Sequence, residues 1–373
     1  MRRVQHPEPF DDVRRIAVLR GGGLGDLMFA EPALRALAHA YPAAQITLMC
    51  FPAQAALLAG RPSPVHHIEV LPVVPGIRPG VEDPPAAEAW LQRMRDEHFD
   101  LAVQVHGGGR YSNPFLLQLG ARHTVGLATA EAAPLERTMP YVYYQHEVLR
   151  ALEVVALAGA QPVALEAELE VTDDDRRRAA PLLPAGDGPL LVIHPGATDP
   201  RRRWPADRFA EVAAQAVASG MRVAAVADAS EAEIADAIVD RARDSTRPVD
   251  AGRLVSLAGR ADLGQLMGIF AHAAVVLGND SGPRHLAQAA GAPTVGIYWV
   301  GNLINAGPLT RAHQRALVSW TNRCPECDID VTQSGAERCE HDVSFVTDVS
   351  VRDALEAILA VTRVTARSHP LPV

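Results

Sequence analysis

Cysteine is scarce in this chain, with four residues in 373, whereas the disulfide frameworks of small secreted proteins need many more. Long hydrophobic runs are missing as well: no stretch of about 18 apolar residues occurs, so we expect no membrane-spanning helix. The formal net charge is −9 at pH 7, and without a basic field we expect no nucleic-acid partner. The polar first residues do not resemble a signal peptide. These absences predict a globular protein of the cytoplasm.

Two common nucleotide-binding loops are also absent. The glycine-rich segment Arg20–Asp26 follows a predicted strand and opens a predicted helix, but Met28 stands where the dinucleotide fingerprint needs its last glycine. The next strand, Ile46–Phe51, ends without the acidic residue that would hold a ribose. No Gly-Lys-Ser/Thr follows the loop, so a P-loop is excluded too.

Strand and helix patterns alternate through both halves of the chain, which predicts α/β structure with parallel sheets covered by helices on both faces. The length favours two domains. We expect a first Rossmann-like domain over residues 1–175, a linker over 176–188 and a second Rossmann-like domain over 189–349. A C-terminal helix and tail over 350–373 are able to pack back on the first domain.

The most informative stretch is Val275–Trp299, which predicts a strand, a tight turn, a helix and another strand. Asp280 and Ser281 are good helix N-cap residues, and Pro283 suits the first helical turn. A helix that opens directly after a strand presents free backbone N–H groups and its positive dipole end, which bind phosphate. With His285 in the same turn, we interpret the stretch as half of a site for a phosphorylated ligand. The alternative is an ordinary, well-capped corner between strand and helix.

Charged side chains follow the other predicted strands of the second half. Thr198 and Arg202 come after the strand LLVIH, where a basic side chain is able to neutralise a diphosphate. Glu231 comes after the strand RVAAVA and is placed to hold ribose hydroxyls; a first-turn helix acid is an equally good interpretation.

In the first half, Asp26 lies where the helix begins. It is either a residue that caps this helix or a general base with access to a substrate hydroxyl. His106 ends another predicted strand. It either lines the acceptor side of a site or is a hydrogen-bonded structural residue.

Three segments, in this order and spacing, resemble glycosyltransferase family 9, the ADP-heptose heptosyltransferases. They read IAVLRGGGLGDLMFAEPALRAL, VIHPGATDPRRRWPADRFAEVA and LGNDSGPRHLAQAAGAPTVGIYW, and the resemblance covers nearly the whole chain. It implies a GT-B architecture, in which two Rossmann-like domains face a central cleft. It also implies inverting transfer of a sugar from a nucleotide-diphosphate donor, most naturally ADP-heptose, without a metal or other cofactor for catalysis.

The resemblance assigns roles residue by residue. It makes Asp26 the catalytic base, and we place Gly23, Gly25 and His106 on the acceptor side. Arg202 stands where the family often has lysine, which keeps the charge but changes the geometry. The donor-binding residues that it implies are Thr198, Arg202, Glu231, Asp280, Ser281, Gly282 and His285.

The expected reaction is a single in-line displacement. Asp26 takes the proton of the acceptor hydroxyl, and Arg202 with the N–H groups near Ser281 and Gly282 stabilises the departing diphosphate. The acceptor stays open between a lipopolysaccharide core sugar, a protein and a small molecule. Two alternatives remain: a sugar-nucleotide epimerase on the same double-Rossmann plan, and a non-catalytic nucleotide-binding assembly protein.

A separate cluster lies within residues 324–341. Cys324 and Cys327 form a Cys-x-x-Cys pair, and Cys339 and His341 follow, which together supply four ligands of the types that a tetrahedral metal site uses. We expect a structural metal there, by default zinc; a redox pair or plain buried thiols are the alternatives. Similar cysteine-rich fingers in heptosyltransferases that modify autotransporters hold iron, so iron stays open, as do a protein acceptor and a homo-oligomer.

Overall fold

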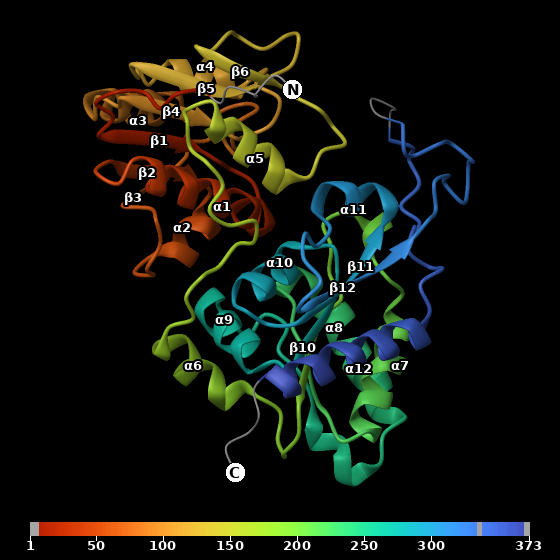
Figure 1. Ribbon diagram of the computed structural model, residues 1–373. Helices are drawn as coiled ribbons and strands as arrows, with labels where there is room; N and C mark the ends of the chain where they lie inside the picture. Colours follow the sequence, from red (N-terminus) through yellow and green to blue (C-terminus); the bar gives the residue numbers. More distant parts are fainter. Residues whose placement is uncertain (1–6, 334–337, 369–373) are drawn as a thin grey trace. The chain divides into compact units, whose positions relative to one another are not determined.

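The computed structural model describes residues 7–333 and 338–368, and the chain divides into two compact units, Met1–Ala167 and Glu168–Val373. Each unit contains one six-stranded parallel sheet with helices packed on it (Figure 1). The predicted fold class, two Rossmann-like α/β domains with parallel sheets, is therefore confirmed.

The first domain has the strand order β3-β2-β1-β4-β5-β6. Its elements are β1 (Arg15–Leu19), α1 (Leu24–Ala40), β2 (Gln45–Cys50), α2 (Pro52–Leu58), β3 (His67–Val70), α3 (Pro84–Asp96), β4 (Leu101–Gln104), α4 (Ser112–Leu117), β5 (His123–Ala128), β6 (Arg137–Pro140) and α5 (Glu147–Ala156). Alternate residues of a strand face opposite sides of the sheet, so Ala17 and Leu19 pack with Trp90 of α3 and Phe115 of α4 in one cluster. Helices α1 and α5 pack against each other.

The second domain has the strand order β12-β11-β10-β7-β8-β9. Its helices and strands are α6 (Asp173–Ala179), β7 (Leu190–His194), α7 (Ala206–Ala218), β8 (Arg222–Ala225), α8 (Ala232–Asp244), β9 (Leu254–Ser256), α9 (Leu263–His272), β10 (Val275–Asn279), α10 (Gly282–Ala289), β11 (Thr294–Trp299), α11 (Val300–Ala306), β12 (Gln314–Ser319) and α12 (Val351–Ser368), with short 3-10 turns at Ala180–Leu182, Pro200–Arg202, Ala229–Glu231 and Pro248–Arg253. The strand, turn, helix and strand predicted for Val275–Trp299 are all present, as β10, α10 and β11.

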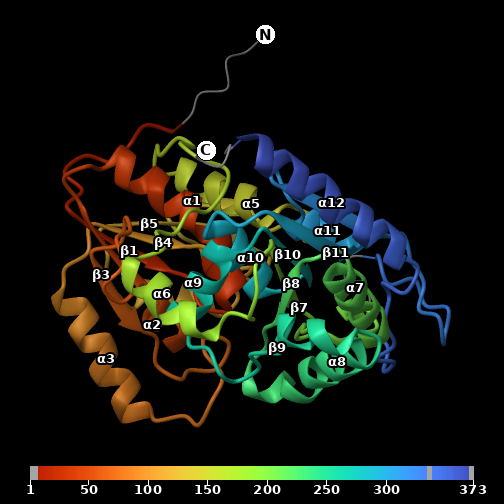
Figure 2. The ribbon, with the colours of Figure 1, turned by 90° about the horizontal axis from the view of Figure 1, so that it is seen from below.

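Helices α7, α8 and α12 bury their apolar stripes against the same face of the second sheet (Figure 2). Ala354, Ile358 and Val361 of α12 are part of this core. The apolar stripe of α12 is thus buried in the second domain.

The acidic and arginine-rich run near residue 175 is helix α6, not the start of a linker. Thr172 Oγ1 accepts a hydrogen bond from Asp175 N at 3.1 Å, and Asp175 Oδ2 accepts one from Thr172 N at 2.9 Å, which caps the helix. Helix α6 packs on α9 so closely that a Cβ at Gly268 would lie 2.1 Å from Asp175 O. The division between the units therefore falls at Ala167, ahead of the expected boundary at residue 175 and the expected linker at 176–188.

Among the described residues, no helix combines the length and the apolar character that crossing a bilayer requires.

Both sheets share one topology. Read from its β9 edge, the second sheet has the order β9-β8-β7-β10-β11-β12, which corresponds strand by strand to β3-β2-β1-β4-β5-β6 of the first. In such sheets ligands bind beyond the carboxyl ends of the strands, where the strand order reverses. In the first domain this switch point lies between β1 and β4, and in the second between β7 and β10.

Candidate functional site

Asp26 lies in the first turn of α1, beside the carboxyl end of β1, and both of its carboxylate oxygens have partners. Oδ2 accepts a hydrogen bond from Gly23 N at 2.8 Å, and Oδ1 lies 2.7 Å from Arg20 Nη2. Gly22 has a φ of +98°, and a Cβ there would lie 2.4 Å from Asp26 Oδ2, so the turn needs glycine. The Asp26 side chain is still 42% exposed. It caps the helix and is also open to a ligand.

Arg20 is a site residue that sequence reasoning missed. Its side chain is only 8% exposed; besides Asp26 Oδ1, it contacts Asp26 O at 3.0 Å and Glu147 Oε2 at 3.4 Å, and donates to Val105 O. The guanidinium therefore holds the Asp26 carboxylate in place and compensates its charge. The sequence did indicate this residue in one respect: Arg20 directly follows a buried strand, at the carboxyl edge of the sheet.

His106 follows β4 and agrees with both interpretations, because it is hydrogen-bonded and also lines the cavity described below. Its Nδ1 accepts a hydrogen bond from Gly21 N at 3.2 Å. Burial lowers the pKa of His106, and the positive charge of Arg20 adds to the effect, so the imidazole is neutral and suited to accepting this bond.

A cavity of about 430 Å³ lies beside His106. Its lining residues are Phe51, Val73, Pro75, Gly76, Ile77, Arg78, Pro79, Gly80, Glu82 and His106. Gly23 and Gly25, which we also placed on the acceptor side, lie at the start of α1, Gly23 as its N-cap and Gly25 as its second residue. The carbonyl oxygen of Gly23 accepts a hydrogen bond from Gln54 Nε2 at 2.9 Å.

Asp280, directly after β10, is a buried carboxylate with partners on three different segments. Its side chain is 3% exposed, with Oδ1 3.0 Å from His285 Nε2 and Oδ2 2.8 Å from Asn302 Nδ2. Complete burial acts to raise the pKa of Asp280, but the hydrogen bond with His285 and the charges of Arg284 and Arg202 outweigh it and lower the pKa to about 2. The carboxylate is therefore ionised and fixed, and it orients its neighbours. Asn302, on α11, was not foreseen.

Arg202 reaches Asp280 from a different segment. We call Asp199–Arg203 the arginine loop; it follows β7, and Arg202 Nη1 lies 3.3 Å from Asp280 Oδ2. The Arg202 side chain is partly exposed, so the guanidinium is able to bind an anion while Asp280 positions it. The chain contains no lysine at all, so arginine supplies every permanently charged cationic side chain.

Ser281 is the N-cap of α10, with φ −153° and ψ 158°. The backbone N–H groups of a first helical turn have no partner within their helix. They follow β10 at the same switch point as Arg202, and this combination of amides and a cation suits a diphosphate.

His194 and Glu231 form the inner part of this site. Ser281 Oγ lies 3.1 Å from His194 Nδ1, and Glu231 Oε2 lies 3.8 Å from His194 Nε2. Burial raises the pKa of Glu231, Asp228 adds to this, and Arg203 opposes it. A Cβ at Gly196 would lie 1.8 Å from Glu231 Oε2, so the turn after β7 leaves space for this carboxyl.

Among the other predicted donor residues, Thr198 is exposed on the turn after β7. Gly282 is the first residue of α10, and His285 is buried behind Asp280. The structure therefore brings Arg202, Asp280, Ser281 and His285 together through direct contacts or one short helical turn.

Asn279 is a further residue whose role was missed. Its Oδ1 accepts a hydrogen bond from Trp204 N at 3.0 Å, which holds the end of the arginine loop on β10.

We predict that acid destabilises the second domain through His194. Complete burial lowers the pKa of His194 to about 4, an effect that Asp228 only partly offsets, whereas the unfolded chain binds the proton near pH 6.5. The unfolded state therefore binds more protons between these values, and the free energy of unfolding falls by about 3 kcal/mol as the pH drops from 6.5 to 4. Urea unfolding across this range, for the wild type and for His194→Gln, measures it. Parallel pH profiles for the two proteins would contradict the assignment.

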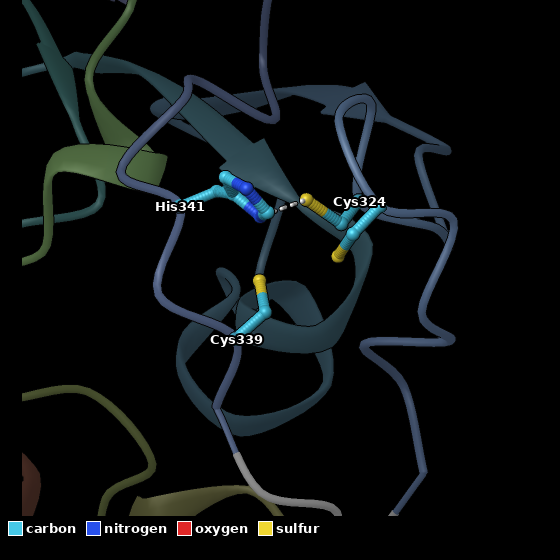
Figure 3. A group of neighbouring side chains, drawn as sticks. Cys324, Cys339 and His341 are labelled. Atoms are coloured by element: carbon cyan, nitrogen blue, oxygen red, sulfur yellow. Dashed lines mark hydrogen bonds between the residues drawn. The ribbon is translucent and has the colours of Figure 1, made fainter.

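The four predicted metal ligands lie together in the second domain. The ligand atoms of Cys324, Cys327, Cys339 and His341 all lie within 4.8 Å of one another. Figure 3 shows the His341 ring and the Cys324 and Cys339 sulfurs pointing toward a common point, with Cys324 Sγ 3.8 Å from His341 Nδ1. In a tetrahedral site with metal–sulfur bonds of about 2.3 Å, ligand atoms are roughly 3.8 Å apart. A small inward movement of the side chains therefore suffices, and the group fits a metal.

The local structure of the cluster favours the ligand form of the Cys324 thiol; for Cys327, a backbone hydrogen bond from Ile329 acts to lower the pKa, but desolvation and the Cys324 and Cys339 side chains outweigh it and raise the pKa. Asp328 N donates to Cys324 O at 2.9 Å and closes the tight turn of the Cys-x-x-Cys pair. Desolvation acts to raise the pKa of Cys324, but hydrogen bonds from the backbone N–H groups of Cys327 and Glu326 outweigh it and lower the pKa to about 7. A thiolate at neutral pH is the form that binds metal.

A doubly wound α/β domain with arginine and backbone amides at its switch point has a site suited to an anionic ligand. The family model of glycosyltransferase family 9 (heptosyltransferase) matches residues 88–333, which is more than half of the chain. The chain therefore belongs to glycosyltransferase family 9, and it is a transferase enzyme.

Two relatives agree with this assignment. The lipopolysaccharide heptosyltransferase 2 of Escherichia coli (strain K12) is 25% identical over 306 residues, which cover 76% of this chain and 82% of that protein. The lipooligosaccharide heptosyltransferase 2 of Haemophilus influenzae is 29% identical over 114 residues. This second match spans 30% of the chain and about a third, 32%, of that relative.

Solved structures share the fold. The E. coli ADP-heptose lipopolysaccharide heptosyltransferase II superposes with a TM-score of 0.72 at 19% identity, covering 94% of this chain and 98% of that one. The iron-containing dodecameric glycosyltransferase TibC from enterotoxigenic E. coli H10407 superposes with a TM-score of 0.55 at 13% identity, covering 97% of this chain and 82% of that one.

Proposed function

We propose that the protein is an inverting heptosyltransferase that transfers heptose from an ADP-sugar to an acceptor hydroxyl. The observation that carries the proposal is the contact of Arg202 with Asp280 beside the N-terminus of α10, since it places a cation and free amides where a diphosphate is expected. Glu231 and Thr198 border the same switch point and are assigned to the rest of the donor. Membership of the family and the names of the E. coli relatives support the choice of heptose and of ADP.

In this mechanism Asp26 removes the proton of the acceptor hydroxyl. The acceptor oxygen forms a bond to the anomeric carbon while the bond to the diphosphate breaks, and inversion follows from this single displacement. The diphosphate leaves with the electron pair, and Arg202 and the α10 amides stabilise its charge. The exposed Asp26 side chain and its fixed orientation support its role as the base. For this reaction, Asp26 must contact the acceptor hydroxyl while that hydroxyl lies next to the sugar of the donor bound at Arg202.

The acceptor is assigned to the cavity beside His106. A lipopolysaccharide core sugar is the first candidate, because the relatives are named for it; a protein or a small molecule remains as an alternative. No cofactor takes part in the transfer itself. We place the enzyme in the cytoplasm, as the sequence composition indicates.

The Cys/His cluster is proposed to hold a structural metal, zinc or iron, and iron has a precedent in the TibC structure. The dodecameric state of TibC makes a homo-oligomer a reasonable expectation for this chain too. Elemental analysis of the purified protein should find about one metal ion per chain. Purified protein with no metal, and with three titratable thiols at these positions, would refute the site.

The experiment that tests the function supplies ADP-heptose with and without a heptose-deficient lipopolysaccharide core and measures ADP release and product mass. We expect ADP release that depends on the acceptor, and a product that is heavier by one heptose and has inverted configuration. Conversion of the free nucleotide sugar without any acceptor would instead favour an epimerase. Binding of ADP without turnover of any acceptor would favour a non-catalytic nucleotide-binding protein.

A further inference from the structure

Residues that directly follow the metal cluster are bonded to the arginine loop. Phe345 N donates to Arg201 O at 2.7 Å, and Ser344 Oγ donates to Arg203 O at 2.6 Å. These two bonds flank Arg202, the residue assigned to the diphosphate. The backbone on both sides of Arg202 is therefore held by the segment that carries Cys339 and His341.

A charged contact joins the same two segments. Arg338, next to the ligand Cys339, has its Nη2 3.5 Å from Asp199 Oδ1. Both carboxylate oxygens of Asp199 in turn accept hydrogen bonds from the Arg201 guanidinium, from Nε at 3.0 Å to Oδ1 and 3.1 Å to Oδ2, and from Nη2 at 2.6 Å to Oδ2. The first residue of the arginine loop is thus connected to the metal segment as well.

Phe345 is common to the cluster and the loop. Its side chain is 1% exposed and packs with Cys324 and Cys339 in one buried group. The Arg201 guanidinium lies 5.5 Å from the centre of the Phe345 ring. Phe345 therefore contacts both the ligand cysteines and the arginine loop.

The other wall of the donor site touches the same phenylalanine. The rings of Phe345 and Trp299 meet edge to face at 5.7 Å, and Trp299 precedes α11. Helix α11 carries Asn302, which binds Asp280. Arg202 is thus adjacent in sequence to Arg201, which lies against Phe345, and Asp280 is connected to Phe345 through Asn302 and the first turn of α11.

The segment has little regular secondary structure of its own. From residue 320 to 333 and from 338 to 350, the described chain forms no helix or strand, apart from one isolated bridge between Arg323 and Asp330. A metal that joins the four ligands would therefore add a strong constraint to the packing of Phe345 that already holds the segment.

We infer that metal bound by Cys324, Cys327, Cys339 and His341 positions the arginine loop, so that the affinity for a nucleoside diphosphate depends on metal occupancy. The inference rests on the proposed function, because it assumes that Arg202 binds the diphosphate. Arg338, Ser344 and Phe345 are positioning residues in this account: they act on Arg202 through the loop and do not contact the donor.

The first test compares ADP binding by calorimetry in metal-loaded protein and in protein stripped with a chelator. We expect the metal-free form to bind ADP at least about fivefold more weakly. Hydrogen exchange of the same samples gives a readout that needs no activity. The amides of Arg202 and Arg203, which donate to Asp199 O and Pro200 O, should exchange faster without metal, whereas that of Trp204, held by Asn279, should not change.

The second test keeps the metal and breaks only the link. The double variant Arg338→Ala/Ser344→Ala removes two contacts with the arginine loop, and should weaken ADP binding about fivefold at full metal content. The matched control Arg323→Ala/Thr332→Ala removes the same charge and a hydroxyl from the same segment, where Arg323 pairs with Asp328 and the Thr332 hydroxyl donates to Asp330. The control should bind ADP like the wild type.

The outcomes separate this inference from the proposed function. The inference is overturned, and the proposed function left intact, if the two double variants bind ADP equally well. The same holds if metal-free protein remains folded and binds ADP as tightly as metal-loaded protein. If stripping unfolds the domain, the pair of double variants decides alone. Failure of metal-loaded wild-type protein to bind ADP at all would instead refute the proposed donor site.

Discussion

Replacing Asp26 with asparagine is expected to slow transfer by about 10³-fold while ADP affinity stays at the wild-type value. The amide keeps the shape of the side chain and an oxygen to accept the bond from Gly23 N, but it is unable to take a proton from the acceptor. Rates of ADP release at saturating donor and acceptor, together with calorimetry of ADP, separate the two effects.

The matched control for this prediction is Asp262→Asn. Asp262 also caps a helix, since its Oδ1 accepts a hydrogen bond from Gln265 N at 2.8 Å, and it also pairs with an arginine, Arg178. It is the N-cap residue of α9 and has no role in the proposed chemistry. This variant should lose some stability and no transfer rate. Equal rates for wild type and Asp26→Asn would remove Asp26 from the chemistry.

Replacing Arg202 with alanine is expected to slow transfer by about 10²-fold or more and also to weaken ADP binding, since the guanidinium stabilises the leaving diphosphate. The variant also takes one cation away from the buried Asp280, which keeps its contacts with His285 and Asn302. Initial rates at several donor concentrations give kcat and KM separately, and both should change.

Arg202→Lys is the informative companion variant. Lysine keeps the positive charge but has no planar fork for two parallel hydrogen bonds, so its activity should fall between those of the wild type and the alanine variant. If the alanine variant binds and transfers as well as the wild type, then Arg202 does not contact the diphosphate.

Much of the fold was predictable because it depends on local patterns. Each buried strand, such as Leu190–His194, is a short apolar run, and each helix has its own caps and apolar stripe. The metal cluster was predictable for a similar reason: its four ligands lie within 18 residues, from Cys324 to His341, so a compact loop alone brings them together.

The partners of the site residues were harder to predict from the sequence, because they depend on tertiary contacts between distant segments. Arg20 meets Glu147 across 127 positions, and Arg202 meets Asp280 across 78. No periodicity or spacing contains these pairings. The expected linker failed for a different reason: the Asp173–Arg178 run is polar enough to suggest a surface segment, but its caps and its contact with α9 make it a helix of the second domain.

The central claim is that a nucleoside diphosphate binds at the switch point of the second sheet. Hydrogen exchange of the metal-loaded protein with and without saturating ADP tests it most directly. The account predicts protection of residues 196–204 and 279–285, and no direct protection of the glycine turn at 21–25. Protection of that glycine turn, with unchanged exchange at 196–204 and 279–285, would contradict it.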